Sequence, residues 1–171
     1  MAESTGFPKE TVCFLMRDNQ MLLAEKTRGK GKGCLNGYGG RVQTEKGERV
    51  LAATLRELRE ESGVLASPKN LQQIAVVYPY INGELQCMVI FFKVRIWLGK
   101  PEETEEMINP NWFPIADLPW EKMMAGDRLW LPFVLGGKNV VAEIPYSNKE
   151  RTKVIEKEVR IWTPSFFLPK Y

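Results

Sequence analysis

The chain has 171 residues, of which 44% are hydrophobic and 26% are charged, a composition that excludes a disordered or fibrous protein. Its 24 basic and 21 acidic residues give a formal charge of +3, too small to indicate a protein that coats a nucleic acid polymer. No apolar run approaches the roughly 18 residues needed to cross a bilayer, so we expect no membrane partner and a cytoplasmic location.

The first elements are two predicted strands. Residues 11–16 and 21–26 are apolar runs separated by a polar Asp-Asn-Gln segment, a spacing typical of a hairpin. Residues 28–40 are rich in glycine and lysine, which predicts a loop leading into a short strand over 38–42. This loop is the first candidate ligand-binding region.

A helix is predicted over residues 48–62. Leu51, Leu55 and Leu58 recur at helical spacing and are expected to face the core, and Gly63 is a plausible C-cap. The helix is therefore expected to be amphipathic, with its polar face directed away from the leucines.

Two long apolar runs follow, over residues 71–80 and 85–98. They are rich in β-branched and aromatic residues, and the Asn82-Gly83 pair between them is a strong hairpin signal. We expect them to be central strands. The acidic, polar stretch 101–110 is expected to be a loop, after which Trp112 and Phe113 return the chain to the core.

The last elements are a short helix and a strand pair. The helix is predicted over 127–135, with Asp127 as its N-cap and two glycines ending it. Residues 140–145 and 154–162 are expected to pair as strands. No repeat interrupts this mixture of strands and helices, so we interpret residues 1–171 as a single α/β domain.

The chain contains no histidine, which excludes a Ser-His-Asp triad, a Cys-His dyad and a histidine metal site. Cys13, Cys34 and Cys87 form no Cys-x-x-Cys pair, so neither a disulfide framework nor a zinc site is indicated. We expect reduced thiols, two of them packed. Acid, base and metal chemistry must then depend on carboxylates.

Three glutamates of the predicted helix supply such a group. With Glu57 as the origin, Glu61 lies at about +40° and Glu60 at about −60°, so the three carboxylates share an arc of roughly 100°. Like charges at this spacing repel one another, which favours a cation between them. Oxygen ligands of this kind suit Mg²⁺ or Mn²⁺ bridging a polyphosphate. The alternative is an ordinary solvated helix face.

The surrounding residues resemble the Nudix box, in which a glycine, five residues and a glutamate precede a conserved helical string. The matching segments are Gly39-Gly40-Arg41-Val42-Gln43, Gly47-Glu48 and Arg56-Glu57-Leu58-Arg59-Glu60-Glu61-Ser62-Gly63-Val64. Seven residues rather than five separate Gly40 from Glu48. An insertion in a loop costs only a few tenths of a kcal/mol, whereas one in the helix would rotate the glutamate away, so we place it within residues 43–46.

The resemblance implies the Nudix fold, an α/β/α sandwich around a central mixed β-sheet with a catalytic loop-helix-loop. It further implies that Glu57 and Glu61 bind Mg²⁺, or Mn²⁺ as a substitute, and that Glu60 assists as ligand or base. Arg56 would pair with Glu48 to brace the helix. The Gly40 carbonyl would be a further ligand.

Outside the box, the chain is similar to the MutT-type branch, which hydrolyses oxidised purine nucleoside triphosphates. The similar positions, spread over residues 11–163, are Lys26, Asn36-Gly37-Tyr38-Gly39-Gly40, Glu105-Glu106-Met107, Trp112-Phe113, Asp127, Trp130 and Pro132. By this resemblance Asn36 and Asp127 would face the base; an amide both donates and accepts. The alternatives are that Asn36 only holds a turn and that Asp127 only caps its helix.

The same resemblance gives four further residues a role. Glu106, or in its place Glu105, would approach the metals, and Tyr78 and Trp130 would stack on the base. Lys26 would meet the phosphates or the ribose. A solvated loop charge, plain core aromatics and a surface lysine are the respective alternatives.

One stretch departs from the branch. Its mammalian pattern has a tryptophan where this chain has Met124, and two adjacent aspartates where this chain has Gly126 and Asp127. Paired acids would let a site share a proton and accept more than one oxidised purine. The departure therefore bears directly on base preference.

The expected activity is hydrolysis of a nucleoside triphosphate such as 8-oxo-dGTP to nucleoside monophosphate and pyrophosphate, which cleanses the nucleotide pool. The alternatives are a Nudix pyrophosphatase for a nucleotide sugar, a dinucleoside polyphosphate or a pyrimidine triphosphate, and a non-catalytic nucleotide-binding module. We expect a small-molecule partner only, and a monomer or weak homodimer.

Overall fold

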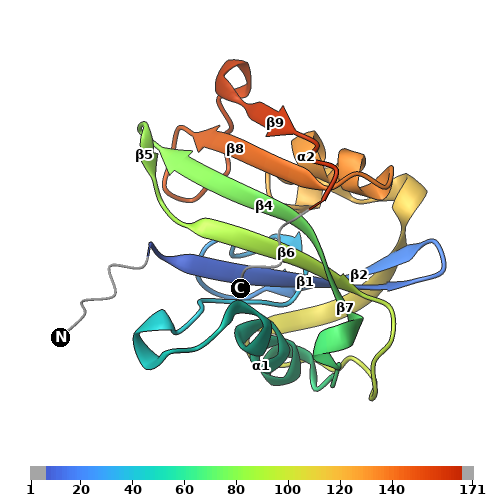
Figure 1. Ribbon diagram of the computed structural model, residues 1–171. Helices are drawn as coiled ribbons and strands as arrows, with labels where there is room; N and C mark the ends of the chain where they lie inside the picture. The colour runs from blue at the N-terminus through green and yellow to red at the C-terminus, as the bar shows by residue number, and fades with distance from the viewer. Residues whose placement is uncertain (1–6, 167–171) are drawn as a thin grey trace.

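The computed structural model describes residues 7–166 and contains one large sheet and two α-helices (Figure 1). In chain order the strands and α-helices are β1 (Lys9–Arg17), β2 (Gln20–Lys26), β3 (Leu35–Asn36), α1 (Val50–Ser62), β4 (Leu71–Ile81), β5 (Glu84–Leu85), β6 (Met88–Val94), β7 (Met107–Pro114), α2 (Asp127–Leu135), β8 (Val140–Tyr146) and β9 (Arg160–Trp162). No helix of this part of the chain is long and apolar enough to cross a membrane.

The sheet is mixed and is covered by a helix on each face. Its strand order is β3-β2-β1-β6-β4-β8-β9, with β5 paired to β4 and β7 to β2. The β1–β6 and β4–β8 pairs are parallel, and the remaining pairs are antiparallel. Residues of α2 pack in one core cluster and residues of α1 in another. This arrangement confirms the predicted α/β/α sandwich.

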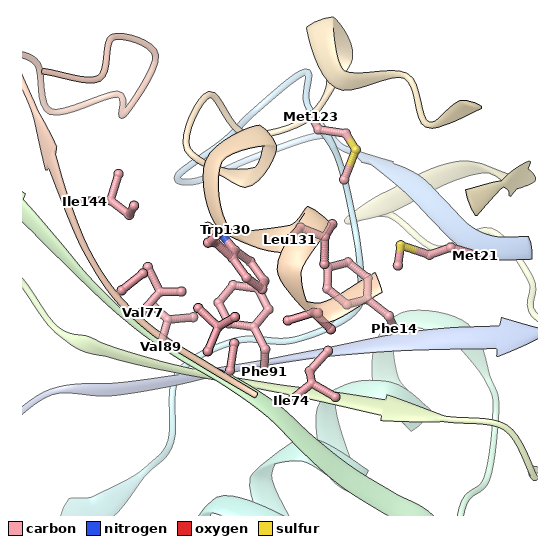
Figure 2. Close-up of a cluster of buried hydrophobic side chains, with 14 of the residues drawn as sticks. Phe14, Met21, Ile74, Val77, Val89, Phe91, Met123, Trp130, Leu131 and Ile144 are labelled. Carbon is pink, nitrogen blue, oxygen red and sulfur yellow. The ribbon is translucent and has the colours of Figure 1, made fainter. Parts of the chain in front are cut away.

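The core beneath α2 is built around aromatic side chains (Figure 2). Trp130 of α2 packs on Phe91 of β6 with ring centroids 4.5 Å apart, and Phe91 stacks on Phe14 of β1. Both Trp130 and Phe14 are fully buried. Such pairs bury large apolar areas and hold α2 in a fixed place on the sheet, which matters because one end of this core opens into a cavity.

The buried face of helix α1 is shifted from the one that its leucines predict. It begins at Val50 rather than at residue 48, and Leu58 is buried while Leu51 and Leu55 are only half-buried. The closest approach runs through the small residues Ala53 and Thr54, both fully buried. Small side chains let the helix lie close to β1, and the buried face consequently extends to Glu61.

Several predicted strand bounds are wrong. Residues 38–42 make only isolated bridges to β1, because the glycine pair interrupts the ladder, and the short β3 lies just before them. The run 85–98 divides into β5 and β6 and ends at Val94. Strand β7 occupies part of the predicted loop 101–110; it lies beyond β2 at an edge, where its prolines are tolerated.

Other predictions are confirmed. The β1–β2 hairpin forms, and the Asn82-Gly83 turn has the positive φ angles of 53° and 78° that its sequence predicts. Helix α2 spans the predicted residues, whereas β9 covers only the end of the predicted 154–162 strand. All three cysteines are free thiols, and two of them, Cys13 and Cys87, are buried.

Candidate active site

The site is organised by the glycine pair that follows β3. The Gly39 amide donates to Oε2 of Glu61 at 2.7 Å, and a Cβ at position 39 would lie 1.9 Å from the Thr11 carbonyl oxygen. A Cβ on Gly40 would lie 2.6 Å from Oε1 of Glu57. Only glycines therefore allow the loop to lie between β1 and the carboxylates of α1.

Arg56 and Glu48 join the start of α1 to the same loop. Nε and Nη2 of Arg56 donate to the two oxygens of Glu48 at 2.7 and 3.0 Å, and Glu48 also accepts from the Gln43 amide at 2.8 Å. The hydrogen bond from Arg56 is the main cause that lowers the pKa of Glu48. The bidentate pair that the family resemblance implied is thus present.

The inserted residues lie where the spacing argument placed them. Residues Thr44–Lys46 form a short 3₁₀ turn, which Gly47 closes with a φ of 75°. This turn precedes α1, so the register of the helical glutamates is unaffected. Glu48 itself lies two residues before the helix rather than in its first turn.

A cavity of about 260 Å³ collects the acidic residues. It is lined by Arg28, Glu57, Glu60, Glu61, Thr104, Glu105 and Glu106. The Glu57 side chain is 14% exposed and Glu61 is buried, whereas the Glu60 side chain is 59% exposed. The solvated-face explanation therefore describes Glu60 but does not describe Glu57 or Glu61.

The carboxylates carry negative charge that burial makes costly. Burial raises the pKa of Glu61 to about 7, and the charges of Glu57 and Glu106 add to the rise, while Gly39 and Lys26 oppose it. Burial is also the main cause that raises the pKa of Glu57. A divalent cation placed among these groups would offset both effects.

Three acids of this cavity, Glu57, Glu60 and Glu106, form ion pairs with arginines. Nη1 of Arg56 lies 2.8 Å from Glu57 and 3.1 Å from Glu60, and Arg28 pairs with Glu106. Within residues 7–166, no three Asp, Glu or Cys side chains are close enough to hold a metal ion in this arrangement.

A larger cavity, of about 360 Å³, lies on the other side of the glycine pair. Its walls bring together four of the five predicted substrate residues, namely Lys26, Asn36, Asp127 and Trp130, and also include Gly40, a predicted metal ligand. Tyr78 is not brought there: its neighbours Val77 and Pro79 line the cavity, and side chains alternate along β4. Gly39 and Gly40 line the large cavity and lie directly against Glu61 and Glu57, which line the carboxylate cavity.

Asn36 and Asp127 have different surroundings within the large cavity. Asn36 ends β3, and its Oδ1 accepts from the adjacent Gly37 amide at 2.8 Å; its amide nitrogen makes no hydrogen bond within residues 7–166. Asp127 is not the N-cap that was expected, because Gly126 occupies that position and Asp127 is the first helical residue. Its Oδ2 is buried without a partner among the described residues, and burial raises its pKa to about 7.

The departures at positions 124 and 126 have a structural basis. Sδ of Met124 lies over Gly31, where a Cβ would be only 2.5 Å away. A Cβ at Gly126 would lie 2.5 Å from the hydroxyl of Tyr146. Tyr146 therefore occupies the space that a second acid next to Asp127 would need.

The sequence did not identify several residues of the large cavity, among them Glu10, Phe91, Tyr146 and Arg151. Phe91 could have been found, because strand alternation places it on the same face of β6 as Val89. Arg151 carries no such signal, since it lies in the loop between β8 and β9 and reaches the cavity only through the tertiary fold.

Comparison with known proteins agrees with this geometry. The NUDIX domain family model matches residues 7–133. An oxidized purine nucleoside triphosphate hydrolase from Danio rerio is 36% identical over 141 residues, covering 82% of this chain and 87% of the relative. The Mus musculus protein of the same name is 30% identical with the same coverage. A mutator MutT protein from Bacillus halodurans superposes with a TM-score of 0.73 at 22% identity, covering 90% of this chain and 97% of that one.

Proposed function

The chain belongs to the Nudix family of hydrolases, and on that premise we propose that it cleaves oxidised purine nucleoside triphosphates to nucleoside monophosphate and pyrophosphate. Its relatives from zebrafish and mouse are named for hydrolysis of this substrate class. In this proposal the enzyme acts on the cytosolic nucleotide pool, so that damaged nucleotides are removed before a polymerase uses them.

One observation carries the proposal: the glycine pair lines the large cavity and lies against the glutamates that line the carboxylate cavity. The apolar and amide-lined cavity suits a base, and the carboxylate cavity suits a metal-bound phosphate chain. A side chain at position 39 would collide with the Thr11 carbonyl, and one at position 40 would collide with Glu57. A nucleotide that lies across the glycine pair has its base near Asn36 and Asp127 and its phosphates over α1.

The carboxylate cavity fits a divalent cation such as Mg²⁺, with Mn²⁺ as a substitute. Glu57 and Glu61 supply hard oxygen ligands that burial makes costly without a cation, and Glu60 and Glu106 lie on the same walls. The Gly40 carbonyl accepts from the Thr11 amide at 2.8 Å, which leaves its second lone pair for an ion. When bound, the ion would neutralise phosphate charge and lower the pKa of the attacking water.

The protein groups perform the remaining steps. The Arg56–Glu48 pair fixes the start of α1 against the loop, so that the carboxylates keep their spacing. One glutamate of the set Glu57, Glu60 and Glu61 removes the proton from the water as it attacks phosphorus. Lys26 lines the large cavity and also acts on the charge of Glu61, a place from which it can meet the phosphates.

The test is turnover of a nucleotide panel with Mg²⁺, using 8-oxo-dGTP, 2-hydroxy-dATP, dCTP and ADP-ribose. We expect the highest kcat/KM for an oxidised purine triphosphate, with pyrophosphate rather than inorganic phosphate as the second product. Higher kcat/KM for dCTP or ADP-ribose would assign a different Nudix substrate. Binding without turnover of any member would show a non-catalytic module.

A further inference from the structure

Arg151 is a buried cation on the wall of the large cavity. It is only 6% exposed, although a guanidinium carries five N–H donors that need acceptors. Charged side chains are rarely buried without a partner, since removing them from water is costly. Its position therefore needs an explanation in terms of what it contacts.

The contacts of the Arg151 side chain are weak. Nη2 donates to the Cys87 thiol at 3.5 Å, and Nη1 lies 3.9 Å from Oε2 of Glu10. Glu10 in turn makes a much closer pair with Lys30, at 2.6 Å. Nε of Arg151 is buried without a hydrogen-bond partner in the described part of the chain. Residues 7–166 thus provide no close acceptor for this guanidinium.

The same cavity holds an unpartnered acceptor. Oδ2 of Asp127 is buried without a partner among the described residues. The cavity lining therefore includes one unmatched acceptor, Oδ2 of Asp127, and one unmatched donor, Nε of Arg151. The charges of Asp127 and Arg151 both shift the pKa of the Tyr146 hydroxyl, so both residues lie near this side chain. A flat ligand with an N–H and a carbonyl oxygen on neighbouring edge positions would satisfy both groups.

We infer that Arg151 is a base-reading residue that donates to a carbonyl oxygen on the purine ring while Asp127 accepts from the adjacent ring N–H. This inference rests on the proposed function and narrows its substrate class to guanine-type purines, which carry an oxygen at ring position 6. An adenine-type purine presents an amino group at that position. Both the amino group and Arg151 are donors, so no hydrogen bond forms between them. Guanidinium groups read guanine in the same way in nucleic-acid complexes.

The departure at position 126 points in the same direction. A single acid stands next to Tyr146, where a pair of acids could share a proton and so accept two kinds of base, and the guanidinium of Arg151 carries donors and no acceptor. The site therefore contains a group that can only donate, whereas a pair of acids can donate or accept according to where the shared proton lies. Fixed donors discriminate strongly, because the wrong base leaves them unsatisfied.

The experiment compares kcat/KM for 8-oxo-dGTP and 8-oxo-dATP in the wild type, in Arg151→Met and in Arg128→Met. Methionine keeps much of the volume and removes every donor. Arg128 is a matched control on α2, since it is half-exposed and pairs with Glu156 outside the large cavity. We expect the wild type and Arg128→Met to favour 8-oxo-dGTP, and Arg151→Met to lose about 10- to 100-fold of that preference.

An unchanged preference in Arg151→Met, or a wild type that favours 8-oxo-dATP, would overturn the inference. If Arg151→Met does not fold, Arg151→Gln supplies an amide that both donates and accepts and so cannot discriminate the two bases, and an unchanged ratio in that variant overturns it equally. If the wild type hydrolyses no nucleotide, the proposed function fails by itself. Calorimetric binding of 8-oxo-dGMP and 8-oxo-dAMP to wild type and Arg151→Met then decides the role of Arg151 independently.

Discussion

The hydrogen bond between Gly39 and Glu61 fixes the position of the Glu61 carboxylate in the site. The Gly39 amide holds one oxygen of Glu61, and the closeness of Thr11 leaves no room for a side chain at position 39. Helical spacing predicted that Glu61 lies beside Glu57. It could not predict that loop backbone holds Glu61 in a buried position, because that contact depends on β1 as well as on α1.

Asp127 gives a prediction at the same scale, in the dependence of stability on pH. Its pKa is about 7 in the folded protein against an ordinary value of 3.8, so the folded state holds the proton more tightly. The stability due to this proton is fully present below about pH 4 and is lost as pH rises to about 7. Asp127→Asn removes the titration, so its unfolding free energy should rise relative to wild type over this range, by at most ~4 kcal/mol.

Urea unfolding of both proteins at pH 4.5 and pH 7.5 measures this effect. The difference between wild type and Asp127→Asn should change between the two pH values, in favour of the variant at pH 7.5. A difference that is the same at both values would show that Asp127 ionises normally in the folded protein.

At the scale of elements, α1 was predicted as a helix, but its buried face is shifted from the predicted one. The leucine spacing indicated a stripe through Leu51, Leu55 and Leu58. Leu58 is fully buried and Leu51 packs against the same core, whereas the rest of the buried face runs through Ala53 and Thr54. Periodicity counts large apolar residues and cannot recognise a helix that approaches a strand through small ones. For similar reasons β7 was missed, since its prolines and asparagines do not alternate as a central strand does.

Thr54 provides the test of this packing. Its hydroxyl is 2.5 Å from that of Thr11 on β1, and both residues are fully buried. Thr54→Val keeps the shape but leaves the Thr11 hydroxyl without this partner, and we expect a loss of ~1–3 kcal/mol in unfolding free energy by urea denaturation.

Two further variants complete that measurement. The double variant Thr11→Val/Thr54→Val removes both polar groups and should recover part of the loss. Thr152→Val, which removes an exposed hydroxyl near Asn148, should change stability by less than ~0.5 kcal/mol. Equal effects of Thr54→Val and Thr152→Val would contradict the assigned contact between α1 and β1.

At the scale of the whole molecule, the site consists of two cavities whose walls come from several segments of the chain. The box residues, Asn36 and Asp127 could be identified from the sequence because their chemistry and spacing are local or because they resemble a known branch. Tyr146 and Arg151 could not, since they approach the cavity from the end of the chain through the packing of β8 and its following loop. Tyr78 was misplaced by one step of strand alternation.

The central claim is that the buried carboxylates of α1 drive cleavage, and turnover of 8-oxo-dGTP with Mg²⁺ by Glu61→Gln tests it most directly. The substitution removes one charge with little change of shape and keeps an oxygen for the Gly39 amide, so the variant should fold. The account predicts a loss of at least ~100-fold in kcat, with no loss in Glu121→Gln, where the side chain is exposed. Full activity of Glu61→Gln would contradict it.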